Sequence, residues 1–306
     1  MQVHREISAL PYFTNAVITI GSFDGVHEGH RKIIRALNEQ AFQVNGESVI
    51  ITFEPHPRKI VNPEKHLQLI NTCDEKIELL EQTGINHLVI VQFDEKFAEQ
   101  SAEEYITEFL VKKFNPHTII IGYDHHFGKG RKGNFALLQQ QSIHYNYKLL
   151  EIPKHVLDEI SVSSTKIRNA LLNSQVELAN KLLGYTFFFE GKVVKGDQLG
   201  RKLGFPTANL EYTDRDKIHL GNGVYAVYVQ IGNQHLKGML SIGNRPTLSG
   251  SPVLVEVNIF DWNKEIYGET IRITVSAYLR KQEKYPDLKS LEIQLQRDKE
   301  SSLKIL

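Results

Sequence analysis

Two histidines stand three residues apart where a helical pattern begins, directly after an apolar segment and among three glycines. The stretch is AVITIGSFDGVHEGHRKII, residues 16–34, and it holds His27 and His30. Residues at i and i+3 face the same side of a helix, and a helix N-terminus offers free N–H groups and a positive dipole end. The spacing therefore predicts a site where two imidazoles bind phosphates and stabilise the charge that develops on them.

Three better-known motifs, for dinucleotides, for nucleotide triphosphates (Walker) and for zinc, fit this stretch less well than a phosphate-binding pair of histidines. Gly21, Gly25 and Gly29 lack the G-x-G-x-x-G spacing of dinucleotide sites, and the chain contains no Walker motif. Zinc is disfavoured, because Arg31 stands where an H-E-x-x-H motif has its second histidine and no third ligand is evident. Two surface histidines beside an ordinary turn would be the simplest alternative if the stretch stood alone.

A second polar group opens another predicted helix. In SVSSTKIRNALL, residues 161–172, Ser163, Ser164 and Thr165 occupy capping positions and Arg168 follows one turn later. A capping cluster alone is usually structural. Because this one follows the last strand of a predicted parallel sheet, its hydroxyls and guanidinium can reach the edge where the histidines lie.

The first half of the chain alternates apolar β-rich runs with helical stretches, which predicts a parallel sheet covered on both faces. The expected strands lie at 16–20, 48–53, 87–93, 117–122 and 147–152, and the expected helices at about 29–42, 74–83, 101–114 and 133–143. A further helix is expected in STKIRNALLNSQVELANKLLG, residues 164–184.

From about residue 186 the pattern changes to long alternating strands. They lie at 186–194, 223–231, 235–243, 253–260 and 271–280, and two of them flank Gly232-Asn233, a dipeptide suited to a tight hairpin. This predicts an antiparallel barrel or sandwich closed by a C-terminal helix near 287–299. We place the domain boundary near residue 184.

Composition limits the classes of partner. Among 306 residues, 36 basic side chains balance 36 acidic ones, 41% are hydrophobic and 24% are charged. No strongly basic domain of the kind that binds nucleic acid is visible, and no segment is long and apolar enough to span a bilayer. The single Cys73 excludes an internal disulfide and suits a reducing compartment, so we expect a cytoplasmic protein.

Together these motifs resemble a known family. GSFDGVHEGH with SSTKIR resembles the nucleotidyltransferase superfamily that carries the HxGH signature. TFEPHPR (52–58) and IIIGYDHHFGKGRKGN (119–134) are similar to the flavin-nucleotide adenylyltransferase half of prokaryotic bifunctional riboflavin kinase/FAD synthetases, although His125-His126 departs from the usual family pattern.

This resemblance implies a doubly wound, Rossmann-like α/β domain over residues 1–184. It implies catalytic roles for His27, His30 and Arg168. It also implies an ATP site and a flavin site in that domain. The implied ATP contacts are Gly21, Phe23, Asp24, Gly29, Ser163, Ser164 and Thr165, and the implied flavin contacts are Pro55, His56, Pro57 and Asp124.

The second half resembles riboflavin kinase, a six-stranded Greek-key barrel, through GDQLGRKLGFPTANL (196–210), GVYAVYV, LSIGNRPTL and VEVNIFDWNKEIYGE. The residues alone suggest a glycine-rich turn at 196–210 and a solvent-facing carboxylate at Glu256. The resemblance instead implies that Glu256 is the base for the ribityl hydroxyl, with Asn258 in place of a histidine common in the family. The implied Mg-ATP contacts are Gly196, Arg201, Gly204, Thr207 and Asn209, with Thr207 and Asn209 also binding the metal.

The expected function is therefore a two-site enzyme over domains 1–184 and 185–306, with Mg²⁺ as cofactor. Riboflavin and ATP give FMN in the second domain, and FMN and ATP give FAD and pyrophosphate in the first. Two alternatives remain open: one active site only, or a flavin- or oligonucleotide-binding barrel attached to a degenerate transferase. The sequence leaves a homo-oligomer open and predicts no nucleic-acid or membrane partner.

Overall fold

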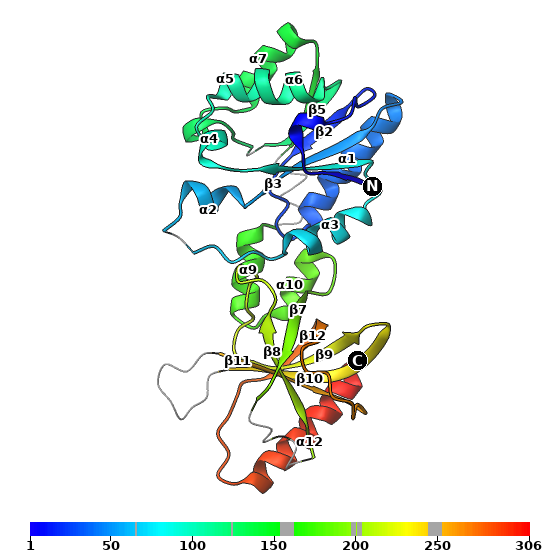
Figure 1. Cartoon of the computed structure of the whole chain (residues 1–306), viewed down its shortest axis with the longest axis vertical. Coiled ribbons are helices and arrows are strands. Elements are labelled where there is room, and N and C mark those ends of the chain that lie inside the picture. Colours follow the sequence, from blue (N-terminus) through cyan, green and yellow to red (C-terminus); the bar gives the residue numbers. More distant parts are fainter. Residues whose placement is uncertain (65, 124, 154–161, 197–199, 201–203, 244–252) are drawn as a thin grey trace. The chain divides into compact units, whose positions relative to one another are not determined.

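The computed structural model (Figure 1) describes residues 1–306 except 65, 124, 154–161, 197–199, 201–203 and 244–252. By its internal contacts the chain forms two compact units, Met1–Leu67 with Asn71–Ser163 and Gln68–Ile70 with Ser164–Leu306. The division falls before the predicted boundary, because helix α10 (Val176–Leu183) packs against strand β12 (Thr270–Arg280) of the second unit. A boundary between activities near residue 184 stays a prediction.

The first unit contains a six-stranded sheet with the order β1-β4-β3-β2-β5-β6, in which every neighbouring pair is parallel. The strands are β1 (Gln2–His4), β2 (Val17–Ile20), β3 (Ser48–Glu54), β4 (His87–Gln92), β5 (Thr118–Gly122) and β6 (Lys148–Ile152). The predicted parallel sheet is confirmed. Strand β1 is additional, since three largely exposed residues at a sheet edge carry little apolar pattern.

The predicted helices of this unit are also confirmed, with small shifts at their ends. They are α1 (Glu28–Gln43), α3 (Cys73–Glu81), the continuous run of α5 (Ala102–Glu104), η2 (Tyr105–Val111) and α6 (Lys112–Phe114), and α7 (Phe135–Tyr145). The middle of that run is π-helical, which periodicity does not reveal. Short elements not predicted are η1 (Ile7–Ala9), α2 (Pro57–Val61), α4 (Glu95–Ala98) and η3 (Lys129–Arg131).

Strand β2, which leads to the two histidines, is buried along its whole length. Ile18 and Ile20 belong to a hydrophobic cluster that includes Ile106 and Phe109 of η2, and α1 also packs against β2. Successive side chains of a strand point to opposite faces, so burial of all of them requires cover on both sides. The doubly wound architecture predicted from the apolar runs is therefore confirmed.

The second unit contains a closed antiparallel barrel of six strands with the order β10-β11-β8-β7-β12-β9. Its strands are β7 (Phe188–Val194), β8 (Thr207–Tyr212), β9 (Gly223–Ile231), β10 (Gln234–Gly243), β11 (Leu254–Ile259) and β12 (Thr270–Arg280). Ile231 pairs with Gln234, so Gly232-Asn233 forms the predicted two-residue hairpin. Strand β8 is additional to the strands that the alternating pattern predicts.

Three helices complete the second unit: α9 (Ser164–Leu172), α10 (Val176–Leu183) and α12 (Leu288–Ile305). The single helix predicted over 164–184 is interrupted, because Ser174 takes a left-handed conformation at φ 59°. Asp287 caps α12 by accepting from Ser290 N, and α12 packs against β9, β10 and β12. In the described part of the chain, no helix combines the length and apolar character needed to cross a bilayer.

Candidate functional site

The turn between β2 and α1 places the two histidines by an unusual backbone path. Phe23, Gly25 and Val26 have φ values of 48°, 92° and 37°. Positive φ is favourable for glycine but costs a β-branched or aromatic residue about 1–3 kcal/mol, and such strain persists where surrounding contacts impose it. Phe23 and Val26 are fully buried, so packing holds the turn in this shape.

His27 and His30 stack against each other at the start of α1. Their ring centroids are 3.6 Å apart with an interplanar angle of 11°, and His27 Nδ1 accepts a hydrogen bond from His30 N at 3.3 Å. A neutral His27 that accepts at Nδ1 carries its proton on Nε2, so Nε2 remains a donor for a ligand. Gly29 leaves room for this ring, because a Cβ there would lie 3.2 Å from His27 Cε1 and Nδ1.

His30 is held in the neutral state. Burial lowers its pKa well below 6.5, and the neighbouring His27 and Lys76 lower it further. Its Nδ1 is buried without a hydrogen-bond partner among the described residues. A buried polar atom of this kind is costly unless a ligand or a water molecule pairs with it. Among the described residues, no group of three or more His, Cys, Asp or Glu could hold a metal ion.

Asp24 links this turn to a helix that the sequence did not implicate. Its Oδ1 accepts from Asn71 N at 3.3 Å, just before α3, and Asp24, Asn71 and Lys76 are all buried. Gly21, Phe23, Asp24 and Gly29 therefore lie in one local cluster with the histidines. Lys76 of α3 was missed, because a lone lysine in an amphipathic helix gives no sequence signal that it is buried.

The predicted flavin residues follow β3. The Glu54–Pro55 bond is cis, His56 Nδ1 accepts from Arg58 N at 3.1 Å, and Pro57 begins α2. His56 is buried, so this turn is fixed by its own contacts. Asp124 lies outside the described residues. The flavin role of these residues remains a prediction.

The second predicted phosphate group lies at the start of α9, in the second unit. Ser164 is the first residue of this helix, with Ser163 immediately before it and Thr165 exposed. Arg168 is buried, and its Nε donates to Gln68 O at 2.9 Å. The helix start is confirmed, whereas the proposed joint action of this group with the two histidines stays a prediction.

The barrel carries a cavity of about 1440 Å³ into which Glu256 and Asn258 project from β11. Glu256 is partly buried, and its backbone is paired with Asn209 of β8 and Ser241 of β10. The carboxylate therefore lines a cavity rather than an open strand face, and its role as a base stays a prediction. Asn258 is buried on the same face, and its Nδ2 donates to Pro206 O at 2.7 Å.

Thr207 and Asn209 lie in strand β8. The turn expected over 196–210 therefore ends before Thr207. Gly196 lies so close to Asn209 that a Cβ would overlap the amide group. Gly204 has φ 77°, and Arg201 lies outside the described residues. The hydroxyl of Thr207 and the amide of Asn209 occupy alternate positions, which places them on one face of the strand.

A second, smaller cavity of about 300 Å³ also reaches Thr207. Its lining includes Val257 and Ile259 of β11 and the aromatic side chains of Trp262 and Tyr267. The odd-numbered residues of β11 face this cavity, whereas Glu256 and Asn258 face the larger one. The two cavities thus lie on opposite faces of one strand and share Thr207.

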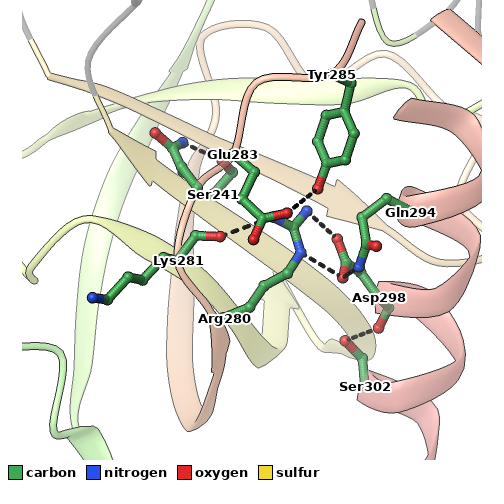
Figure 2. Close-up of polar contacts among 9 residues, drawn as sticks. Ser241, Arg280, Lys281, Glu283, Tyr285, Gln294, Asp298 and Ser302 are labelled. Atoms are coloured by element: carbon green, nitrogen blue, oxygen red, sulfur yellow. Dashed lines mark hydrogen bonds and ion pairs between the residues drawn. The ribbon is translucent and has the colours of Figure 1, made fainter. Parts of the chain in front are cut away.

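One wall of the larger cavity depends on a buried ion pair (Figure 2). Arg280 Nε donates to Asp298 Oδ1 at 2.8 Å and Arg280 Nη2 to Asp298 Oδ2 at 2.6 Å, and Gln294 Nε2 also donates to Oδ1 at 2.9 Å. Asp298 is one of only two residues of α12 that are fully buried, the other being Ser302. This ion pair therefore connects the helix that closes this side to β12.

Comparison with known proteins covers both units. A model of the FAD synthetase family matches residues 11–166, and a model of the riboflavin kinase family matches residues 183–306. The chain is 35% identical over 283 residues to the bifunctional riboflavin kinase/FMN adenylyltransferase of Escherichia coli (strain K12), covering 92% of this chain and 90% of that one. Identity to the enzyme of the same name from Bacillus subtilis (strain 168) is 33% over 293 residues, covering 94% and 92%. A crystal structure described as a macrolide-efflux protein from Streptococcus pneumoniae shares the fold with a TM-score of 0.86 and 30% identity, covering 98% of this chain and 97% of that one.

Proposed function

The chain belongs to the family of bifunctional riboflavin kinase/FMN adenylyltransferases, and from this premise we propose that it converts riboflavin to FMN and then FMN to FAD. The observation that carries the proposal is the match of two family models to successive parts of one chain, with His27 and His30 inside the FAD synthetase match and Glu256, Thr207 and Asn209 inside the riboflavin kinase match. ATP is the co-substrate of both steps. We expect the reactions to take place in the cytoplasm, in keeping with the single cysteine.

In the adenylylation step, a phosphate oxygen of FMN attacks the α-phosphorus of ATP and pyrophosphate leaves. No covalent enzyme intermediate is needed, so alignment and charge stabilisation supply most of the rate. We assign the Nε2 proton of His27 and the buried ring of His30 to the phosphate oxygens, together with the N–H groups at the start of α1. Ser163, Ser164, Thr165 and Arg168 are assigned to the same phosphates.

In the kinase step, the terminal ribityl hydroxyl of riboflavin attacks the γ-phosphorus of ATP and ADP leaves. Glu256 orients this hydroxyl and accepts its proton. Because Glu256 lines the larger cavity, we assign that cavity to riboflavin. The smaller cavity, with its aromatic side chains and its access to Thr207, is assigned to the nucleotide.

Thr207 and Asn209 fit a magnesium site. A hydroxyl and an amide carbonyl are oxygen donors of the kind that a hard cation prefers, and Gly196 leaves room beside Asn209. Bound Mg²⁺ would neutralise charge on the ATP phosphates. The residues themselves hold the phosphate end of the nucleotide next to Glu256, at the junction of the two cavities.

The direct test is to incubate the purified protein with riboflavin and Mg-ATP and to separate the flavins by chromatography. We expect FMN to form first and FAD to follow, with both reactions lost when magnesium is chelated. Accumulation of FMN without FAD, or conversion of supplied FMN without use of riboflavin, would mean that one site alone is active. Flavin binding without turnover would contradict the proposal.

A further inference from the structure

Lys76 is a buried lysine next to the adenylylation site that the proposed mechanism does not use. It lies in the first half of α3, and the residue is 5% exposed. The chain just before α3 is attached to the phosphate-binding turn through the hydrogen bond from Asn71 N to Asp24. A lysine is rarely buried to this extent without a partner, so its position calls for a physical reason.

Within the described part of the chain, Lys76 forms no hydrogen bond and no ion pair within 4.0 Å. Burial lowers its pKa, and the more distant Asp24, Cys73 and Glu54 oppose that effect without cancelling it. The folded protein thus places an ammonium group where its charge is disfavoured. Such a group is retained at functional sites, where a ligand of opposite charge supplies the missing partner.

The nearby charges indicate where that ligand lies. Lys76 is close enough to His30 to lower the pKa of that ring, and His30 Nδ1 is itself buried without a described partner. Asp24 and Glu54 contribute negative charge that repels a polyphosphate. A neutral histidine ring supplies no positive charge to offset this repulsion. Lys76 is a buried cation on which both carboxylates act, and it can offset part of their repulsion of a polyphosphate.

We propose that Lys76 is a further phosphate-binding residue of the adenylylation site, with Nζ contacting an anionic oxygen of the pyrophosphate part of ATP. The proposal rests on the function proposed above. A lysine ammonium acts as a point charge on phosphate, and in a dry site its contact is charge-assisted and strong. The buried charge of Lys76 lowers stability in the free protein and becomes favourable when the triphosphate is bound.

The test compares three variants of the full chain. Lys76→Met removes the charge at nearly constant length, Lys76→Arg retains it, and Lys112→Met is a matched control at an exposed lysine of the same unit. Binding of inorganic pyrophosphate is measured by calorimetry, and FAD formation is measured at varied ATP. We expect Lys76→Met to raise the Kd for pyrophosphate and the KM for ATP by about tenfold or more, Lys76→Arg to retain part of the affinity, and Lys112→Met to change neither.

One further measurement separates phosphate binding from a purely structural role. Lys76→Met should unfold at the same or a higher temperature than the unmodified protein, because a disfavoured buried charge is removed. A structural lysine would instead lower the unfolding temperature and leave the Kd for pyrophosphate unchanged, and that pair of results would overturn the proposal.

The outcomes also distinguish this proposal from the function on which it rests. Unchanged pyrophosphate affinity in Lys76→Met, with FAD still formed by the unmodified protein, would reject the role of Lys76 alone. Weakened pyrophosphate binding in Lys76→Met, with no FAD formed by the unmodified protein, would support the role of Lys76 and reject the adenylylation activity.

Discussion

The two candidate sites are built by different means. The turn of the first unit to which we assign phosphate binding uses residues adjacent in sequence, from Phe23 to His30, held in shape by a strained backbone and a stacked pair of rings. The larger cavity of the barrel instead collects side chains from β8, β11, β12 and α12, and one wall depends on the Arg280–Asp298 ion pair. A site of the first kind should tolerate change elsewhere in the fold, whereas the second should respond to distant substitutions.

The largest effect is expected at His30. Because its ring is buried in the phosphate-binding turn, His30→Ala should reduce FAD formation by about 10²- to 10³-fold, the range typical of removing a group that stabilises transition-state charge. FMN formation from riboflavin should persist in the same preparation. Chromatographic separation of the flavins measures both steps, and an equal loss of both in the folded variant would contradict the assignment.

Glu256→Gln should separate binding from turnover in the barrel. The substitution keeps shape and polarity but removes the base, so riboflavin phosphorylation should fall by on the order of 10²-fold. Riboflavin should still bind, which fluorescence titration measures, and supplied FMN should still become FAD. Intact phosphorylation would return Glu256 to the status of an ordinary strand carboxylate.

Asp298→Asn tests whether the cavity wall depends on its ion pair. The side chain of Asp298 is 4% exposed. Removing its negative charge leaves the Arg280 guanidinium without a compensating charge at this position. We expect the free energy of unfolding of the barrel to fall by about 3 kcal/mol and the KM for riboflavin to rise about tenfold. Asp261→Asn is the matched control, because its side chain is 92% exposed at 4.0 Å from Lys299. An equal effect of both substitutions would refute a special role for the buried pair.

A smaller effect is expected at Arg168. Lysine keeps the charge but loses the planar fork of donors, and Arg168 Nε already donates to Gln68 O. Arg168→Lys should therefore raise the KM for ATP in FAD formation several-fold and leave riboflavin phosphorylation unchanged. Identical ATP saturation curves for the variant and the unmodified protein would remove Arg168 from the phosphate site.

The smallest effect is expected from pH. His30 has a lowered pKa, so its neutral form persists as the pH falls and protonation begins only well below 6.5. FAD formation should change by less than about twofold between pH 8 and pH 6.5, and its acid limb should lie below that range. An acid limb centred at or above pH 6.5 would show that the ring is not held neutral as the structure indicates.

The sequence was sufficient for features that depend on local pattern. The parallel strands, the Gly232-Asn233 hairpin and the position of the histidines at a helix start all follow from periodicity and turn chemistry. Strand β8 was missed because Thr207 and Asn209 follow a glycine- and proline-rich segment typical of a turn. Lys76 and the Arg280–Asp298 pair depend on which helices pack where, which neither spacing nor composition specifies.

The arrangement of β11 limits how this strand can vary. Glu256 and Asn258 face the larger cavity, while Val257 and Ile259 face the smaller one. Alternate residues of β11 therefore line different cavities. Gain or loss of one residue before Glu256 would exchange the two sets of side chains and direct the carboxylate away from the larger cavity, which we assign to riboflavin. Homologues can therefore diverge along β11 by replacement of side chains, whereas changes in length should be confined to the loops at its ends.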